Sequence, residues 1–281
     1  MKRLLTALVP IAAAIGAGAA EPRAAPGEEP AGVSYLATDA TAFKDPCDPG
    51  RTARVRIQEA AVQAPLAAFA AGSATWGLAG WAGWTRLDFQ DYPGLGAEDL
   101  RGAALGLFAD QPAADRWGWS AAVMPGYFGE ARLMAQGLVR RRLSPAWRLE
   151  LGAAWDDAFG EPRLFPVGGA VWEAPGGFAL RLRFPASSAH WAPTENLGLF
   201  ALVAPAGNRW VTRDGGDEWI FVLEGWRAGL GAEGRLWRNL WVRIAGGREF
   251  ARRYEAERDG RTELDEDVAE AWFASVALVV Q

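Results

Sequence analysis

The chain has 281 residues, with 34 acidic and 29 basic side chains, a formal net charge of −5 at pH 7, one cysteine and one histidine. The negative charge argues against a general nucleic-acid binder, and a single cysteine with a single histidine excludes both an internal disulfide and a zinc site built from those ligands. Fifteen tryptophans stand beside very little isoleucine, whereas a soluble protein packs large aromatics among dense branched aliphatic side chains.

The first twenty residues have the organisation of a secretory signal peptide. Lys2 and Arg3 precede a short apolar run that ends in small residues, so we expect cleavage near Ala19 or Ala20 and export of the mature protein. A retained N-terminal anchor is the alternative. No later stretch reaches the ~18 continuous apolar residues of a transmembrane helix. Residues 21–52 are rich in Pro, Ala and Gly without periodicity, which predicts a flexible tail or a small plug.

Period-2 alternation dominates the rest of the chain, in segments of about 10 residues separated by Pro, Gly, Asn or Asp. A sheet of this size must remove its edges. We therefore predict an all-β, closed, antiparallel up-and-down barrel of about 12 strands over residues 53–281, with 10 and 14 as alternatives because 65–73 and 186–195 are irregular. The twelve segments lie at 53–63, 74–89, 100–109, 116–128, 131–143, 146–157, 163–173, 177–192, 196–204, 218–232, 239–250 and 268–280.

The segment WRLELGAAWDD (147–157) bears on whether the barrel is soluble or spans a membrane. Trp147 and Trp155 end an apolar stripe, while Arg148 and Glu150 point to the opposite face. The two tryptophans are about 26 Å apart along the strand, or ~19 Å in height when tilted, which suits aromatic girdles near the two membrane interfaces. A soluble barrel would show the same alternation. Export, strand length and terminal aromatics together favour a stripe that faces lipid.

The charged face would then line the lumen, where a charge must be paired or hydrated. Two interpretations follow. The first is a narrow, arginine-lined channel or transporter for small solutes. The second is a structural or surface-interaction barrel whose lumen is filled by its own ionic network, with Glu173, Glu224 and Glu249 among the opposing acids. The predicted lumen-lining residues are Arg132, Arg140, Arg148, Glu150, Arg181, Arg183, Arg227 and Arg243.

Six segments carry a resemblance to a known family. They are WTRLDF (84–89), LFPVGGAVWE (164–173), LRLRFP (180–185), NLGLF (196–200), WRAGLGAEGRLWRNLWVRIAGG (226–247) and EFARRYE (249–255). In their order and spacing the chain resembles a family of Gram-negative outer-membrane β-barrel proteins catalogued as a domain of unknown function. The resemblance implies a barrel in the outer membrane and supplies no catalytic residues. Expected partners are outer-membrane lipids, lipopolysaccharide, the barrel-assembly machinery and small solutes.

Two motifs could carry chemistry. GLGAEG (229–234) matches the dinucleotide fingerprint, but an alternating segment follows it where the fingerprint requires a helix, so we expect a hairpin and no cofactor. Ser188 and His190 share one face of a strand, as a hydroxyl nucleophile and its base would. Nothing in the spacing specifies Glu173 or Glu195 as the orienting acid. We therefore expect no enzyme, and keep a lipid-modifying hydrolase as an alternative.

The acidic, glycine-containing segments at ~205–217 and ~252–267 predict loops outside the cell, and 233–238 predicts a short periplasmic turn. Both chain termini then lie in the periplasm. With twelve strands, however, the short turns at 144–146 and 174–176 would also have to be external.

Overall fold

A computed structural model describes residues 31–45, 48–93, 95–113, 116–214 and 216–280. These residues form seventeen strands in a single antiparallel sheet, and among them there is no helix long and apolar enough to cross a membrane. The strands are β1 (Ala31–Thr38), β2 (Thr41–Asp45), β3 (Asp48–Ala71), β4 (Ala74–Gln90), β5 (Ala97–Gln111), β6 (Trp117–Tyr127), β7 (Ala131–Arg142), β8 (Trp147–Asp156), β9 (Arg163–Ala174), β10 (Phe178–Phe184), β11 (Ser187–Thr194), β12 (Leu197–Pro205), β13 (Asn208–Asp214), β14 (Asp217–Trp237), β15 (Leu240–Arg258), β16 (Arg261–Val268) and β17 (Ala271–Val280).

The sheet closes into a barrel of fourteen strands. β1 pairs with β17 in a register that runs from Ala31 opposite Val280 to Thr38 opposite Phe273. At three positions in the barrel, two consecutive short strands pair with the same long neighbour and so count as one barrel strand. β1 and β2 both pair with β3, β12 and β13 both pair with β14, and β16 and β17 both pair with β15. The closed antiparallel barrel is confirmed, and its strand number is fourteen, one of the alternatives, where about twelve was expected.

Two additional strands explain the difference. The predicted segment 177–192 is two strands, β10 and β11, joined by a turn at 185–186. The predicted tail or plug at 21–52 is wrong for residues 31–38, 41–45 and 48–52, which are strand; within the described residues the barrel therefore begins at Ala31 instead of 53. Small residues weaken the period-2 signal in β1. The strand nevertheless has two distinct faces, since Val33 and Tyr35 are exposed while Leu36 is buried. The predicted signal peptide and residues 21–30 lie outside the described residues.

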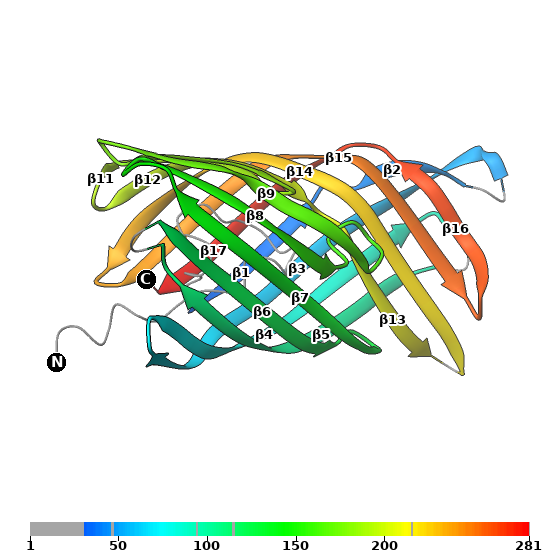
Figure 1. Cartoon of the computed structure of the whole chain (residues 1–281). Helices are drawn as coiled ribbons and strands as arrows, with labels where there is room; N and C mark the ends of the chain where they lie inside the picture. The colour runs from blue at the N-terminus through cyan, green and yellow to red at the C-terminus, as the bar shows by residue number, and fades with distance from the viewer. Residues whose placement is uncertain (1–30, 46–47, 94, 114–115, 215, 281) are drawn as a thin grey trace.

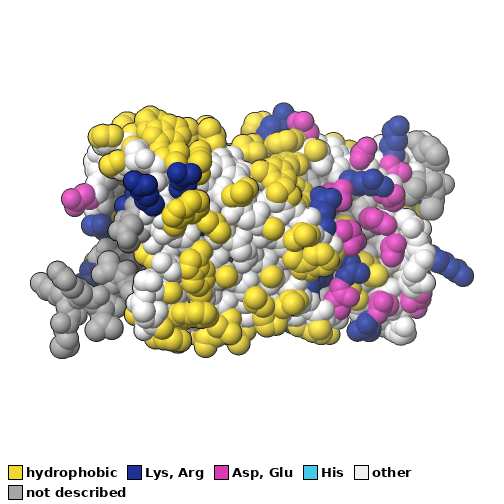
Figure 2. All heavy atoms as spheres, in the orientation of Figure 1, with side chains coloured by type: hydrophobic (Ala, Val, Ile, Leu, Met, Phe, Trp, Pro, Cys, Tyr) yellow, Lys and Arg dark blue, Asp and Glu magenta, His cyan; other side chains and the backbone are white. Residues whose placement is uncertain are grey.

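Apolar side chains cover the outer wall. Trp147, Leu151 and Trp155 in β8 are 45%, 71% and 44% exposed, whereas Glu150 and Asp156 on the opposite face of the same strand are 2% and 3% exposed. Figure 2 shows an apolar surface along most of the barrel, with acidic and basic side chains gathered together at one end. Apolar side chains outside and charged side chains inside are the pattern of a membrane-spanning barrel, in which lipid solvates the outer face.

The two ends of the barrel differ (Figure 1). We call the end with Ala31 and Val280 the terminal end; short turns at 72–73, 143–146, 175–177, 195–196 and 238–239 lie there. We call the opposite end the distal end. There β13–β14 and β15–β16 project as two strand pairs, and β15–β16 are joined by a turn at 259–260.

Two expectations about these ends are corrected. The segments predicted as long loops at ~205–217 and ~252–267 are mostly strand, because their hydrogen-bonded ladders continue past the apolar part of the wall. The turns at 144–146 and 174–176 lie at the terminal end with 238–239. The reason is the additional strand in 177–192. Because neighbouring strands are antiparallel, one more strand there reverses the direction expected for every earlier strand, and so moves each earlier turn to the other end of the barrel.

Candidate functional site

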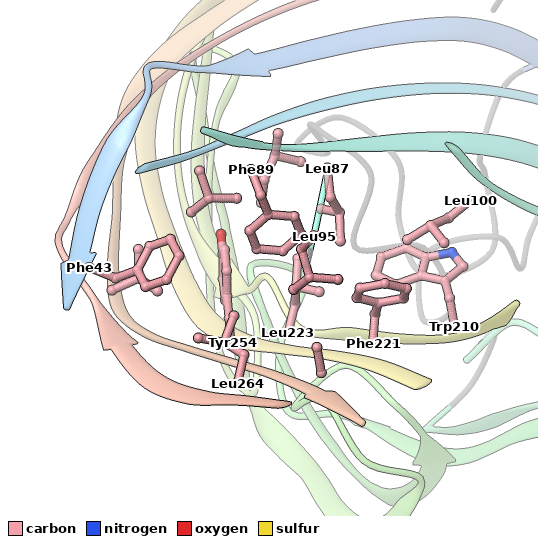
Figure 3. Close-up of a cluster of buried hydrophobic side chains, with 14 of the residues drawn as sticks. Phe43, Leu87, Phe89, Leu95, Leu100, Trp210, Phe221, Leu223, Tyr254 and Leu264 are labelled. Carbon is pink, nitrogen blue, oxygen red and sulfur yellow. The ribbon is translucent and has the colours of Figure 1, made fainter. Parts of the chain in front are cut away.

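The distal half of the lumen is filled by apolar side chains, which we call the mouth cluster (Figure 3). All except Leu95, which lies in the connection between β4 and β5, come from strands, several of them far apart in sequence, and each is less than 9% exposed. Phe89 and Phe221 stack with ring centroids 6.5 Å apart, and Phe43 contacts Phe89 edge-on at 6.3 Å. The cluster comprises Phe43, Leu87, Phe89, Leu95, Leu100, Trp210, Phe221, Leu223, Tyr254 and Leu264. It was not predicted, because the alternation in the sequence indicates a lumen that is polar throughout.

Below the mouth cluster, charged side chains occupy the lumen. Seven of the eight predicted lumen residues form ion pairs, and Arg181, on the face of β10 that carries Arg183, also has an interaction. Six of them, all except Arg148 and Arg181, are less than 9% exposed: Arg132, Arg140, Glu150, Arg183, Arg227 and Arg243.

One network centres on Glu150, whose side chain is fully buried. Its Oε1 accepts a hydrogen bond from Arg148 Nε at 3.1 Å and lies 3.9 Å from Arg140 Nε, and its Oε2 accepts from Arg183 Nη1 at 3.4 Å. Arg140 also donates to Asp110 Oδ1 at 2.6 Å. One carboxylate therefore holds three guanidinium groups from β7, β8 and β10 in place.

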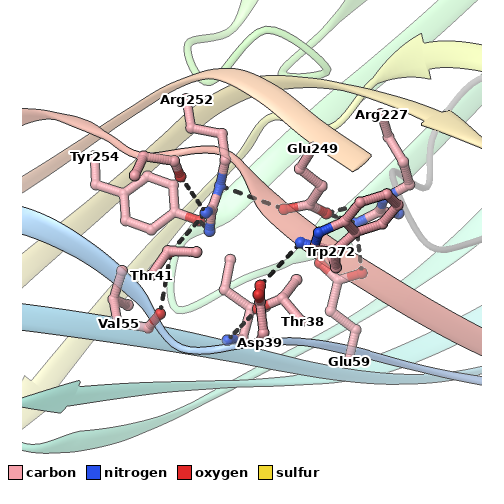
Figure 4. A network of polar contacts seen from close by, with 12 residues as sticks. Thr38, Asp39, Thr41, Val55, Glu59, Arg227, Glu249, Arg252, Tyr254 and Trp272 are labelled. Carbon is pink, nitrogen blue, oxygen red and sulfur yellow. Dashed lines mark hydrogen bonds and ion pairs between the residues drawn. The ribbon is translucent and has the colours of Figure 1, made fainter. Parts of the chain in front are cut away.

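A second network joins β3, β14 and β15 (Figure 4). Arg227 donates to Glu249 Oε1 at 2.9 Å and 2.6 Å and to Glu59 Oε2 at 3.4 Å. Arg252 Nε lies 3.4 Å from Glu249 Oε2, and Arg252 also donates to the Tyr254 hydroxyl. The charges of Glu59, Glu249, Arg227 and Arg252 balance inside the barrel.

Arg252 was not predicted to face the lumen, because simple alternation places it on the outside. Glu249 faces the lumen, so Arg252, three residues later, should face away. The register of β15 against β14 shifts between Trp226–Phe250 and Glu224–Arg253, which gives β15 one extra residue, and Ala251 has a φ of +50°. Such a β-bulge exchanges the two faces of a strand. A bulge of this kind has no signature in the sequence.

The single histidine belongs to a third network. His190 Nε2 lies 3.3 Å from Glu233 Oε1, and Arg243 donates to Glu233 Oε2 at 2.8 Å. Gly198 leaves room for them, since a Cβ there would come within 2.7 Å of His190 Nε2.

The predicted Ser–His pair does not form a catalytic arrangement in the described residues. The side-chain partner of His190 is Glu233, and the Ser188 side chain makes no hydrogen bond within this part of the chain. Of the two acids proposed as the orienting group, Glu173 pairs instead with Arg148 at 3.6 Å. Within the described residues, no three His, Cys, Asp or Glu side chains lie close enough to hold a metal ion.

A fourth network closes the distal end. Arg132 pairs with Asp157 and lies 3.5 Å from Glu130, while Arg209 pairs with Glu130 and lies 3.6 Å from Glu161. These residues come from the 128–130 turn, β7, the 157–162 loop and β13. The network thus ties β13 to two turns on the opposite part of the rim.

Backbone contacts reinforce this closure. Val211 N donates to Phe128 O and Gly207 N donates to Ala158 O, both at 3.0 Å. Gly129 has a φ of +82°, and a Cβ there would lie 1.3 Å from Val211 O. Only glycine allows so close an approach. The β13 strand therefore rests on the 128–130 turn without forming a continuous ladder with it.

Several solved structures are similar in fold. They include the COG4313 outer membrane channel from Pseudomonas putida F1, with 12% identity, a TM-score of 0.46, and coverage of 90% of this chain and 96% of that one. Acinetobacter baumannii OccAB4 has 9% identity, a TM-score of 0.34 and coverage of 89% and 98%, and a Pseudomonas aeruginosa FadL homologue has 11% identity, a TM-score of 0.34 and coverage of 89% and 89%. No curated protein matches the chain.

The family model described as a domain of unknown function, DUF6268, matches residues 67–276, which span β4 to β16 and parts of β3 and β17. The chain belongs to this family, and its described residues fold as a closed β-barrel.

Proposed function

We propose that the protein is an outer-membrane channel or transporter for small solutes, and that the contacts across its distal end are those of a closed state. The observation that carries this proposal is the way the end is closed. Arg209 of β13 pairs with Glu130 in the 128–130 turn and lies 3.6 Å from Glu161 in the 157–162 loop, and two backbone hydrogen bonds join the same segments. Such contacts can separate while every strand ladder of the barrel stays intact.

The contents of the lumen support a selective path. The mouth cluster excludes hydrated ions as long as it is packed, because an apolar constriction sheds water. Below it, arginines such as Arg148 and Arg183 would attract anionic or amphiphilic solutes once water enters.

Planar-bilayer recording of the purified, reconstituted protein tests the proposal. Wild type should be closed for most of the time. Arg209→Gln should raise the open probability several-fold, because Arg209 joins β13 to the 128–130 turn and the 157–162 loop. Arg213→Gln is the matched control: Arg213 lies in the same strand but is 62% exposed and pairs with Glu218 on adjacent β14.

The selectivity of the open state gives a second measurement. In the Arg209→Gln background, an added Arg181→Ser and Arg183→Ser pair should shift anion preference toward cations. If all variants stay silent and folded, the barrel is a filled structural or surface-interaction protein, and the channel proposal is wrong.

The orientation belongs to the same proposal: the distal end faces outward and the terminal end faces the periplasm. Outer-membrane barrels combine short periplasmic turns with longer, polar external segments. Thiol labelling of intact cells tests this with Asp259→Cys in the distal turn and Asn239→Cys in a terminal turn, both in a Cys47→Ser background. Labelling of the terminal variant alone would reverse the orientation.

A further inference from the structure

The outer wall at the distal end is asymmetric in charge. On β13–β16 the exposed arginines are paired: Arg213 with Glu218, Arg253 with Asp265 at 2.7 Å, and Arg258 with Asp217. On β2–β5 the outer wall carries a group of cations that we call the basic face, comprising Lys44, Arg54, Arg56, Arg86 and Arg101. Among the described residues, only Arg86 of this group has an ion-pair partner.

The register places these cations on one surface. Arg56 lies opposite Asp88, Gln58 opposite Arg86, and Trp84 opposite Arg101. All of them alternate with buried residues of β3, β4 and β5, so they share the outer face. Diagonal neighbours on such a sheet are about 7–8 Å apart, a separation that long arginine side chains span. Several guanidinium groups can therefore reach the same small anion.

The two acids within the basic face are already engaged. Asp99 accepts a hydrogen bond from Trp84 Nε1 at 3.1 Å and lies 3.7 Å from Arg86 Nη1, and Asp88 accepts from Gln90 Nε2 at 3.1 Å. Five cations against two acids leave a local excess of positive charge, in a protein whose net charge is −5. This excess requires an external anion if it is to be neutralised.

The apolar wall begins directly below the basic face. Arg101 lies opposite Trp84, and the outward positions that follow toward the terminal end are apolar. On β5 they are Ala103 and then Leu105, which is 49% exposed, and on β3 the first is Val62, which is 48% exposed. A ligand that fills both surfaces must carry anionic groups immediately above hydrocarbon chains. This is the chemistry of a phosphorylated amphiphile in a lipid leaflet.

We propose that the basic face binds the phosphate groups of lipopolysaccharide in the outer leaflet, with the acyl chains lying on the apolar wall below. Arginine suits this task because its planar guanidinium can hydrogen-bond a phosphate through two nitrogens. The inference rests on the outward orientation of the distal end proposed above. It does not depend on whether the lumen conducts.

The test compares two double variants that remove equal charge. Arg56→Gln with Arg101→Gln removes two unpaired cations of the basic face, and Arg253→Gln with Arg258→Gln removes two paired arginines of β15 as the control. Each purified protein is titrated in detergent with lipopolysaccharide, and both affinity and thermal stabilisation are measured. We expect the basic-face variant to lose about tenfold or more in affinity, since each lost arginine removes a charge-assisted hydrogen bond, while the control binds like wild type.

Two further ligands separate a phosphate site from general attraction to negative charge. Dephosphorylated lipopolysaccharide should bind wild type as weakly as the intact lipid binds the variant. Phosphatidylglycerol, an anionic phospholipid, should stabilise wild type less than lipopolysaccharide does. Equal stabilisation by the two lipids, or equal affinity of the two double variants, would overturn the proposal. If thiol labelling shows the distal end in the periplasm, the site is not one for this glycolipid. A silent channel leaves the binding result unaffected.

Discussion

Replacing Glu150 by glutamine tests how the lumen is stabilised. The wild-type carboxylate lies 3.1 Å from Arg148 Nε, 3.4 Å from Arg183 Nη1 and 3.9 Å from Arg140 Nε. With an effective dielectric constant of about 20, each of these distances corresponds to a gross attraction of about 4–5 kcal/mol. Desolvation of the buried groups offsets much of it.

The variant leaves three guanidinium groups around a neutral amide. Removing one partner of a buried ion pair costs about 3–5 kcal/mol, since the remaining charge stays desolvated. Arg183→Gln should cost only about 1–2 kcal/mol, because Glu150 keeps Arg148 and Arg140. The Glu150→Gln and Arg183→Gln double variant should be more stable than Glu150→Gln alone, because one of the stranded cations is gone.

Equilibrium unfolding of the reconstituted barrel in guanidinium chloride measures these differences, with the fluorescence of its fifteen tryptophans as the signal. The order of the two single variants is the decisive result. If Glu150→Gln and Arg183→Gln cost the same, the three arginines do not share one buried carboxylate, and water must solvate them separately.

Three other substitutions have defined outcomes. Gly129→Ala should push the 128–130 turn away from Val211 O, so bilayer recording should show more frequent openings; unchanged recordings would contradict the closure of the distal end. Gly198→Val should separate the buried imidazole from its carboxylate, and the signal of the single histidine in a ¹⁵N spectrum should shift, whereas an unaltered signal would contradict that contact. The hydrogen bond from Arg253 lowers the pKa of Asp265 in the exposed β15–β16 pair, so the resulting stability is present at neutral pH and is lost as the pH falls through that lowered pKa. An NMR titration should find a higher Asp265 pKa in Arg253→Gln; the same pKa in both proteins would refute this cause.

The parts of the fold that follow from the sequence are those where one strand carries a strong contrast between its faces. In β8 the alternation of Trp147, Leu149 and Leu151 with Arg148 and Glu150 is enough to assign the outer and inner faces. In β1, alanine, glycine and serine reduce this contrast, so the sequence predicts a tail where the barrel has a strand. The limit is physical, because small side chains change little in free energy between lipid and lumen.

The mouth cluster could not be predicted for a different reason. The rule that polar side chains face inward applies only where lipid surrounds the wall. β13 and β16 extend past the apolar band, and there Trp210 and Leu264 face inward while charged side chains face outward, as in a soluble sheet. The sequence pattern does not show at which residue of a strand the surroundings change from lipid to water. The 14-strand count and the Arg252 bulge depend on pairings that single segments do not encode.

The β1–β17 seam has a consequence for how the chain is made. Eight consecutive residue pairs close the cylinder, and they join the first described strand to the last, so the cylinder cannot shut until both have arrived at the membrane. β1 is synthesised before β17, yet it can pair with this neighbour only after the rest of the barrel has been made. Ala31 lies directly opposite Val280, so the two ends of the described barrel are adjacent. A short peptide linking these ends, with new ends cut at the 259–260 turn, should give a circularly permuted barrel with the same wall.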